Sequence, residues 1–279
     1  MILNWRGWQD TLACIQSLKR SDYTNLQIVV VDNDSQDESV SQIRVSYPDI
    51  ALIETRRNLG FAGGNNIGIR YALEHGAEYI WLLNNDTVVD PGALTAMVEL
   101  AEKDRRIGVV GSVLYYMEQP TKVQAWGGGR VNLITGRSRH LLAPGEPHYI
   151  TGASVLLRSE AIKQVGLLDE GFFMYWEDVD LSLRLRKAGW KLAVADDARV
   201  LHKESASAGK KSSFQDELYS TSSVQFLWRH APFPLLPLVA VIGARLLKRV
   251  LIGDWNRVKA TWRGFIRGFY VKQPDSQSS

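Results

Sequence analysis

Runs of apolar residues alternate with helical patterns over the first hundred residues of the chain. Residues 28–31 form an unbroken run of β-branched side chains, residues 51–53 a weaker run, and residues 79–83 a third. Four neighbouring segments repeat their apolar residues at helical spacing: 9–19, 36–45, 62–75 and 91–103. Continuous apolar strands that alternate with helices are typical of a mostly parallel sheet covered on both faces. The pattern therefore predicts an α/β fold.

Polar residues follow each predicted strand. A first strand of only three residues, 1–3, precedes Asn4 and Trp5, and the later strands end at Asp32 and at the Asn-Asn-Asp segment 84–86. In open parallel sheets, ligands bind beyond the carboxyl ends of the strands. We therefore expect the functional site at these ends.

The second half of the chain begins with a looser pattern. Turn signals interrupt residues 108–157, where we expect short strands that extend the sheet. Residues 172–189 return to a helical pattern. The domain that all these elements form is expected to cover residues 1–228.

A basic and partly apolar segment follows at residues 229–272. Residues 231–244 are uncharged, but they include three prolines and are too few to span a bilayer, which takes about 20 apolar residues. Beyond them, apolar residues at steps of three and four would share one face of an amphipathic helix: Trp255, Val258, Trp262, Phe265 and Phe269. Such a helix fits a membrane interface; packing on the domain or on a second copy of the chain is the alternative. Residues 273–279 are expected to be disordered.

Charge is the feature of composition that changes this picture most. The 279 residues, 45% of them hydrophobic, suffice for one large domain with a core and a tail. The net charge is +3, but residues 229–272 hold nine Lys or Arg against one acid, so the rest of the chain is acidic overall. A basic end suggests an anionic surface as partner, and no recognition motif supports nucleic acid. The single cysteine and the absence of a signal-peptide pattern fit the cytoplasm.

Two motifs at the strand ends could bind a nucleotide. Asp32 could accept hydrogen bonds from a nucleobase or ribose, although an isolated Asp before a helical segment is more often a helix cap. Residues 57–66 form a glycine-rich turn into a helix, where small residues would let the backbone approach a diphosphate. The G-x-G-x-x-G spacing is missing, so the turn alone is weak evidence.

Two carboxylate motifs could carry chemistry. Asp86 could hold Mg²⁺ or Mn²⁺ at a diphosphate if a second ligand is supplied. His202 is the obvious candidate, and its imidazole would favour Mn²⁺. Residues 176–178, Trp-Glu-Asp, open a helix, and one of these acids could take the proton from an acceptor hydroxyl. Acids in a first turn also stabilise the helix dipole, so a purely structural role is the alternative.

Taken in order, these elements resemble the family 2 glycosyltransferases of the GT-A fold, and especially the bacterial rhamnosyltransferase-like members that build cell-surface polysaccharides. The resemblance covers residues 1–228. Its carriers are Asn4-Trp5, residues 31–35, residues 57–66, Asn84-Asn85-Asp86, Thr151-Gly152-Ala153, Trp176-Glu177-Asp178, and His202 with Ser205 and Ser207. It implies a Rossmann-like, mostly parallel central sheet with flanking helices, followed here by C-terminal amphipathic helices.

The resemblance also assigns the donor side of the site. Asp86 and His202 would bind Mn²⁺ or Mg²⁺. Asp32 would hold the nucleobase, and residues 203–211 would form a loop that closes over the diphosphate. The residues implied to surround the nucleotide and donor are Asn4, Trp5, Asp32, Asn58, Gly60, Asn66 and Asn85.

On the acceptor side, the resemblance makes Asp178 the catalytic base, with Glu177 in support. Gly152 and Trp176 would meet the acceptor, and the Trp176 ring would stack on a sugar. Two features depart from the family pattern. The first strand is shorter than usual, which puts donor binding at Asn4 in doubt. Asn84 replaces the first acid of the metal motif, a variant familiar among rhamnosyltransferase-like members.

These implications predict an inverting, metal-dependent glycosyltransferase. The donor would be dTDP-rhamnose, the acceptor a lipid-linked glycan, and the enzyme would lie at the inner face of the plasma membrane, with a homo-oligomer left open. A nucleotidyltransferase is one competing hypothesis, but it would not need the Trp-Glu-Asp element and would release pyrophosphate. A non-catalytic nucleotide-binding scaffold is the other.

Overall fold

A nine-stranded mixed sheet forms the centre of the protein, in a computed structural model that describes residues 1–203 and 212–270. The strand order is β3-β2-β1-β4-β11-β6-β12-β5, and β7 pairs with β6. The strands are β1 (Ile2–Asn4), β2 (Val29–Asp32), β3 (Ala51–Glu54), β4 (Tyr79–Asn84), β5 (Thr87–Val89), β6 (Ile107–Tyr116), β7 (Gln119–Trp126), β11 (Ser154–Arg158) and β12 (Lys191–His202).

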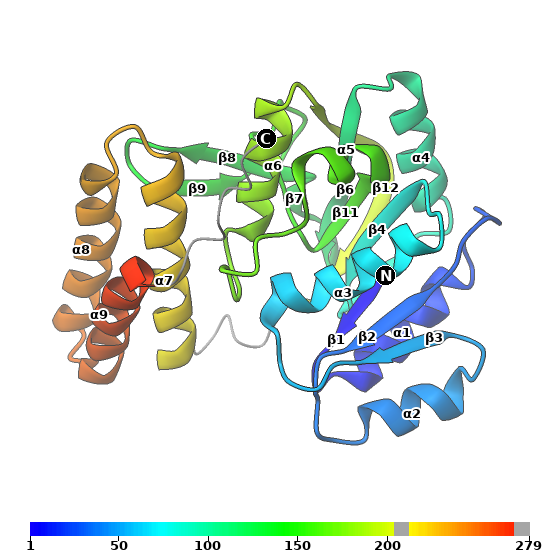
Figure 1. The fold of residues 1–279 in the computed structure, drawn as a ribbon, viewed down its shortest axis with the longest axis horizontal. Coiled ribbons are helices and arrows are strands. Elements are labelled where there is room, and N and C mark those ends of the chain that lie inside the picture. Colours follow the sequence, from blue (N-terminus) through cyan, green and yellow to red (C-terminus); the bar gives the residue numbers. More distant parts are fainter. Residues whose placement is uncertain (204–211, 271–279) are drawn as a thin grey trace.

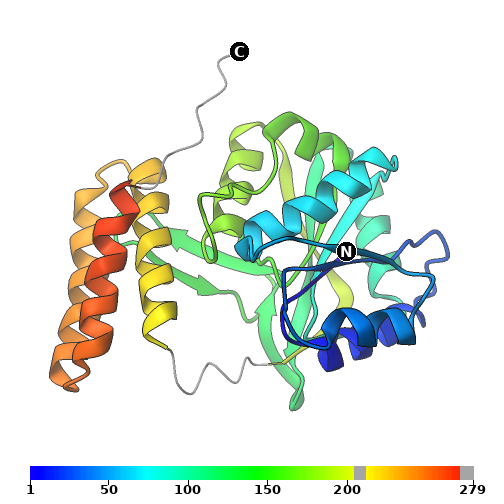
Figure 2. The same ribbon diagram turned by 60° about the horizontal axis from the view of Figure 1, so that its bottom comes forward.

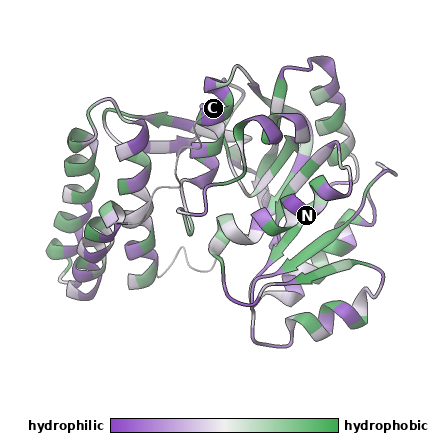
Figure 3. Cartoon of the chain, viewed as in Figure 1, coloured by the Kyte–Doolittle hydropathy of each residue, from purple (hydrophilic) through white to green (hydrophobic). Residues whose placement is uncertain are grey.

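Helices cover both faces of this sheet (Figures 1 and 2), as the apolar pattern predicts. One face packs on α1 (Trp8–Leu18), α2 (Ser39–Ser46) and α4 (Ala93–Lys103). The other packs on α3 (Gly60–Glu74), α5 (Ser159–Val165) and α6 (Glu177–Lys187). Figure 3 shows the strands between them as the most hydrophobic part of the body. The predicted α/β fold is therefore confirmed.

Parallel pairing brings the polar strand ends together. β1 pairs in parallel with β2 and with β4, so that Asn4 lies opposite Asp32 and Leu3 opposite Asn84. β11, which runs antiparallel to β4, adds the next strand, and Ser154 lies opposite Leu83. The antiparallel strands were expected only as unspecified extensions of the sheet.

A small second sheet links the body to the C-terminal helices. It consists of β10 (Tyr149–Ile150), β8 (Gly128–Asn132) and β9 (Arg137–His140). The three helices beyond it are α7 (Ser213–His230), α8 (Leu235–Leu251) and α9 (Trp255–Tyr270), which stand together at one end of the molecule (Figure 1). α7 runs across the predicted boundary at residue 228 and packs on the body through Val224 and Phe226.

α9 contacts α7 through its small residues. Ala260, Thr261, Gly264 and Gly268 are buried, and a Cβ on Gly264 would lie 2.2 Å from the Glu217 carbonyl oxygen. Of the predicted aromatic face, Trp262 and Phe269 point outward and are 50% and 43% exposed, whereas Phe265 packs against the core cluster that includes Val224. None of the helices in residues 1–203 and 212–270 has the length and hydropathy needed for a membrane span.

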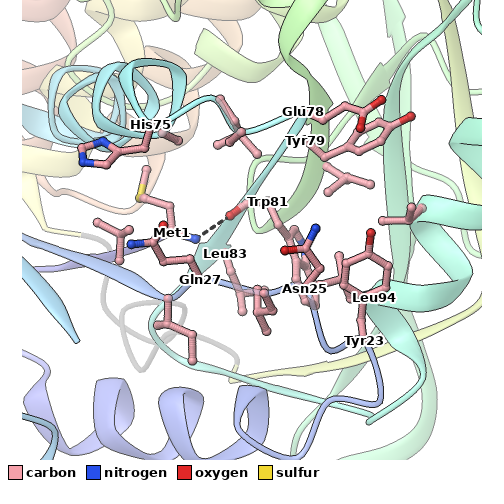
Figure 4. A pocket seen from close by; sticks show the side chains of 18 of the residues that line it. Met1, Tyr23, Asn25, Gln27, His75, Glu78, Tyr79, Trp81, Leu83 and Leu94 are labelled. Atoms are coloured by element: carbon pink, nitrogen blue, oxygen red, sulfur yellow. Dashed lines mark hydrogen bonds between the residues drawn. The ribbon is translucent and has the colours of Figure 1, made fainter. Parts of the chain in front are cut away.

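A cavity of about 370 Å³ opens at the amino ends of β1 and β4 (Figure 4). Met1, Tyr23, Tyr79 and Trp81 are among its lining residues, and the Met1 amino group donates a hydrogen bond to the Trp81 carbonyl oxygen at 2.8 Å. Asp32 and Asn84 lie at the opposite ends of their strands. This cavity is therefore separate from the strand ends at which the site is expected.

Two glycine-to-alanine substitutions should distinguish the tight contact between α9 and α7 from an open position on α8. We expect Gly264→Ala to destabilise the protein by about 1–3 kcal/mol, because the added carbon forces α9 away from α7. Gly243→Ala is the matched control, since a Cβ at this position on α8 meets nothing within 4 Å. It should stabilise the helix by roughly 0.5–1 kcal/mol. Urea unfolding measures both, and equal effects would contradict the packing.

Candidate functional site

Asp32 is held in a closed network at the end of β2. Its carboxylate is 3% exposed and accepts hydrogen bonds from the Asn4 side chain at 2.7 Å and from the Ser35 hydroxyl and amide at 2.6 and 3.1 Å. Helix α2 begins at Ser39 with Glu38 as its N-cap, so the helix-cap interpretation of Asp32 is wrong. The Oδ2 atom accepts only the Ser35 amide among the described residues and can accept one more donor.

Asn4 orients this carboxylate and does not face a ligand. It is fully buried, and its Oδ1 atom accepts a hydrogen bond from the Thr11 hydroxyl at 2.7 Å. Both ends of its amide are therefore occupied, which does not support direct donor binding. Trp5, the next residue, is 47% exposed and remains available to a nucleotide.

The glycine-rich turn packs against protein, contrary to the expectation of a diphosphate cradle. Gly60 has φ +72°, and a Cβ there would lie 2.2 Å from the Phe173 carbonyl oxygen. Gly64 approaches the Leu3 side chain in the same way, so α3 can lie close to β1. Small residues are needed here because neighbouring segments fill the space.

Asn66 also turns inward. Its amide nitrogen donates to the Leu168 carbonyl and to Glu170 at 2.8 and 3.0 Å, and its oxygen accepts from the Leu168 amide at 3.1 Å. With 1% exposure it has no group left for a nucleotide, so the role implied for it is not supported. Asn58 instead accepts hydrogen bonds from Asn33 and from the Gly60 amide at 3.0 and 2.8 Å, which fixes the loop beside Asp32.

Asp86 and His202 lie together between β4 and the end of β12. The His202 Nε2 atom is 3.3 Å from the Asp86 Oδ1 atom, and the two side chains are 15% and 20% exposed. The Nδ1 atom lies 2.7 Å from the Gln124 side-chain oxygen, which can only accept, so Nδ1 carries the proton. Nε2 is the ring nitrogen that faces Asp86.

Such a pair suits a divalent cation. Carboxylate oxygen and imidazole nitrogen are both ligands of divalent metals, and a histidine whose other nitrogen is held by an amide oxygen is a typical metal ligand. In residues 1–203 and 212–270, no group of three or more His, Cys, Asp or Glu could hold a metal ion. A metal held by Asp86 and His202 would therefore need further ligands from outside these described residues, such as oxygens of a bound ligand or water.

Neighbouring polar groups hold the turn that carries Asp86 in place. Asn84 approaches Nε2 of His202 at 3.4 Å, while Asn85 donates to the Gly7 carbonyl and the Thr11 hydroxyl at 3.2 and 3.1 Å. Asn85 thus ties the turn to the loop after β1. The predicted loop over the diphosphate, with Ser205 and Ser207, lies outside the described residues except for Lys203, whose amine pairs with Asp10.

Asp178 occupies the first turn of α6. Its Oδ2 atom accepts the Gly152 amide at 3.0 Å, and its Oδ1 atom accepts the Val179 amide at 2.8 Å. Burial raises the pKa of Asp178, and the Gly152 hydrogen bond opposes that shift. Gly152 thus positions the carboxylate. Glu177 is 6% exposed with one oxygen unpaired among the described residues, and burial and then the Asp178 charge raise its pKa well above the usual value.

A left-handed turn presents these two acids. Tyr175 and Trp176 both have φ +74°, a conformation that costs non-glycine residues about 1–2 kcal/mol each. The Trp176 ring, however, does not face an acceptor. It is 4% exposed, stacks on Phe226 at 4.4 Å and donates to the Ser223 hydroxyl at 3.1 Å. The expectation of sugar stacking is wrong for this structure, because the ring anchors the turn in the core.

A hydrogen bond between adjacent strands connects the turn that carries Asp86 to the segment that holds Asp178. The Asn84 amide donates to the Ala153 carbonyl at 2.9 Å, and Ala153 follows Gly152, which holds Asp178. Asp86 is two residues beyond Asn84. The structure therefore connects the Asp86–His202 pair to the half-buried carboxylate of Asp178, whose pKa is raised, at one edge of the sheet. Gln124 and Asn33 are the site residues that sequence reasoning missed.

The sequence matches the family described as glycosyl transferase family 2 over residues 2–166. An N-acetylglucosaminyl-diphospho-decaprenol L-rhamnosyltransferase from Mycobacterium tuberculosis is 27% identical over 252 residues, which cover 78% of this chain and 81% of the relative. The galactofuranosyltransferase GlfT1 of the same species is 30% identical over 185 residues, or 63% of this chain and 60% of the relative.

Two solved structures share the fold. The mannosyltransferase PcManGT from Pyrobaculum calidifontis, in complex with GDP-Man and Mn²⁺, aligns with a TM-score of 0.61 at 15% identity and covers 98% of this chain and 75% of its own. GalNAc-T7 with UDP, GalNAc and Mn²⁺ aligns with a TM-score of 0.68 at 15% identity, over 96% and 55%. These likenesses confirm the predicted GT-A fold.

Glu177→Gln should change how stability depends on pH. The pKa of Glu177 is raised in the folded state, so the folded protein binds this proton more tightly than the unfolded chain, and stability falls as pH rises above about 4.5. The variant should gain free energy of unfolding over wild type at pH 8 and none at pH 4. Urea unfolding across this range measures the difference. The exposed Glu118→Gln is the control, and a pH-independent difference for Glu177→Gln would contradict the assignment.

Proposed function

The chain belongs to glycosyl transferase family 2 and is a glycosyltransferase, and from this premise we propose that it moves a sugar from a nucleoside diphosphate to a hydroxyl of a lipid-linked glycan, with inversion at the anomeric carbon. The observation that supports the proposal is the chain of contacts between the two groups of residues. The amide of Asn84, two residues before Asp86, donates to the Ala153 carbonyl, and the neighbouring Gly152 amide donates to Asp178.

Asp86 and His202 would hold the divalent metal, for which the imidazole ligand favours Mn²⁺ over Mg²⁺. When bound, the metal neutralises the charge that develops on the leaving diphosphate. Gln124 keeps the proton on Nδ1 of His202 and so leaves Nε2 free as a ligand. Asn85 fixes the turn that carries Asp86.

Asp178 would act as the base. It takes the proton from the acceptor hydroxyl while that oxygen attacks the anomeric carbon from the face opposite the diphosphate. A pKa raised by burial moves a carboxylate towards the working pH, where it is a better proton acceptor. The charge of Asp178 adds to burial in raising the pKa of Glu177, which keeps the pair short of two full negative charges.

The donor would lie along the ends of β1 and β2. Asp32 has one oxygen able to accept a donor from the nucleobase or ribose, and Trp5 offers an exposed ring nearby. The relative named as an L-rhamnosyltransferase supports dTDP-rhamnose as donor and a diphosphate-linked lipid as acceptor. A nucleotidyltransferase is not favoured by the family, and a non-catalytic scaffold would bind nucleotide without transfer.

We further propose that α8 and α9 rest on a membrane surface. Large apolar side chains of these helices are exposed: Leu235, Leu236, Val239, Leu247, Val250, Leu251, Trp255, Trp262, Ile266, Phe269 and Tyr270. Lys248, Lys259 and Arg263 are exposed on the same helices. An apolar face beside basic residues suits an anionic bilayer surface, and a cytoplasmic donor would place it at the inner leaflet.

Two aspartate variants should separate binding from turnover. Asp178→Asn should lower kcat by about 10²–10⁴-fold and leave Mn²⁺-dependent nucleotide binding intact, because the base contacts only the acceptor. Asp86→Ala should abolish that binding. Thermal unfolding with a panel of nucleoside diphosphates measures it, since a ligand at about 100 times its Kd adds about 2.7 kcal/mol. Asp197→Asn, at an exposed position on β12, is the control. Full turnover in Asp178→Asn would remove it as the base.

Vesicle sedimentation tests the membrane surface. The double variant Trp262→Ser, Ile266→Ser should bind vesicles containing anionic phospholipid about tenfold more weakly or worse, because two apolar side chains no longer enter the interface. Leu142→Ser is the matched control, as Leu142 is 64% exposed after β9, outside α8 and α9. Equal losses for both, or no binding by wild type, would overturn the proposal.

A further inference from the structure

A cluster of arginines lies between the three C-terminal helices. Asp216 of α7 is 1% exposed and pairs with Arg249 of α8 at 2.9 Å and with Arg257 of α9. Arg245, one turn before Arg249, reaches the same carboxylate only at 3.8 Å. Three guanidinium groups therefore share one buried carboxylate.

Nearby acids do not balance these cations. Glu217 is already paired with Arg263 and Arg267 at 3.1 and 3.6 Å, and Asp254 lies 4.0 Å from Arg257. Arg263 and Arg267 are 64% and 66% exposed, so water screens their charges. In the buried part of the cluster, three arginines face two carboxylates: Arg245, Arg249 and Arg257 against Asp216 and Asp254. The excess positive charge is costly in a partly buried site unless an anion joins it.

Arg245 is the least satisfied member of this arginine cluster. Its guanidinium carbon lies 3.6 Å from the centre of the Tyr219 ring, and its side chain is 23% exposed. Burial lowers its pKa, and the charge of Arg249 adds to that effect. The Nε atom of Arg249 is buried without a hydrogen-bond partner among the described residues. Both groups could bind an anion that enters from the Arg245 side.

The arginine cluster adjoins the loop that presents the catalytic acids. The Tyr219 ring lies 5.7 Å from the ring of Tyr175 and 6.1 Å from that of Trp176. These two residues form the left-handed turn directly before Glu177 and Asp178. Only one aromatic ring therefore separates Arg245 from this turn, on the acceptor side of the site.

We propose that Arg245, with Arg249 behind it, binds the phosphate groups that join the acceptor glycan to its lipid. The inference rests on the proposed function. A lipid-linked glycan has a sugar hydroxyl, a diphosphate and an apolar chain in that order. The protein offers the base Asp178, the arginine cluster and the exposed apolar residues of α8 in the same order. A guanidinium group that stacks on an aromatic ring, as Arg245 does on Tyr219, keeps its N–H groups available to phosphate oxygens.

Kinetics with two acceptors test this assignment. One is N-acetylglucosamine on a short polyprenyl diphosphate, and the other is the same sugar on an uncharged octyl group. We expect Arg245→Gln to raise KM for the diphosphate acceptor by about 10–100-fold, which is the effect of losing a charged hydrogen bond. KM for the octyl acceptor and for the nucleotide sugar should not change. Arg245→Lys should restore part of the affinity, because it keeps the charge.

Lys163→Gln is the matched control, since it removes an exposed charge from α5, outside the C-terminal helices. A wild-type enzyme that uses neither acceptor would contradict the proposed function. A wild-type preference for the diphosphate acceptor that survives in Arg245→Gln, with the thermal stability unchanged, would overturn the Arg245 site alone. The same holds if Arg245→Gln and Lys248→Gln weaken binding to anionic vesicles equally and spare both KM values, because the arginine would then meet phospholipid headgroups.

Discussion

The antiparallel pairing of β11 with β4 is the contact on which the site depends. It sets the Asn84 amide on the Ala153 carbonyl at 2.9 Å, and so places Gly152, which holds Asp178, next to the turn that carries Asp86. A shift of one residue in this register would turn every side chain of β11 to the other face of the sheet. The hydrogen bonds of the Ser154 hydroxyl with Trp81 and of the Arg158 guanidinium with the Ile107 carbonyl oppose such a shift.

The turn before α6 shows why the C-terminal helices matter to catalysis. Two consecutive left-handed residues, Tyr175 and Trp176, are unfavourable by themselves. Stacking of Trp176 on Phe226 and its hydrogen bond to Ser223 offset this cost, and both partners belong to α7. A helix beyond the family match at residues 2–166 therefore holds the strained turn that aims Glu177 and Asp178.

Sequence patterns predicted the parts of the molecule that depend on continuous burial. The strands at residues 28–31 and 79–83 and the helices between them follow from apolar runs and helical spacing. β12 was missed because its pairing with β6 shifts between Ala195 and Arg199, where two exposed acids interrupt the apolar residues. Motif order also selected Asp86 and His202, which lie 3.3 Å apart, and Asp178, which accepts a hydrogen bond from the Gly152 amide.

The sequence could not assign the roles of residues whose contacts come from segments far away in the chain. Asn66 and Gly60 belong to a motif that suggests a nucleotide, yet they contact the segments at Leu168 and Phe173, about a hundred residues away in the chain. Gln124, which fixes the tautomer of His202, is an ordinary polar residue in β7. No local spacing distinguishes a polar side chain with a protein partner from one left free for a ligand.

The sequence of α9 likewise did not show which face of the helix packs against the protein. Its periodicity correctly indicated an amphipathic helix, and the usual inference is that the aromatic face packs inward. The glycines at 264 and 268 reverse this, because they let α9 approach the α7 backbone more closely than any aromatic side chain would. Trp262 and Phe269 are then left in water, where each Å² of apolar surface forfeits about 25 cal/mol. An apolar phase that covers this face would recover that free energy, and a bilayer surface provides one without disturbing the α7–α9 contact.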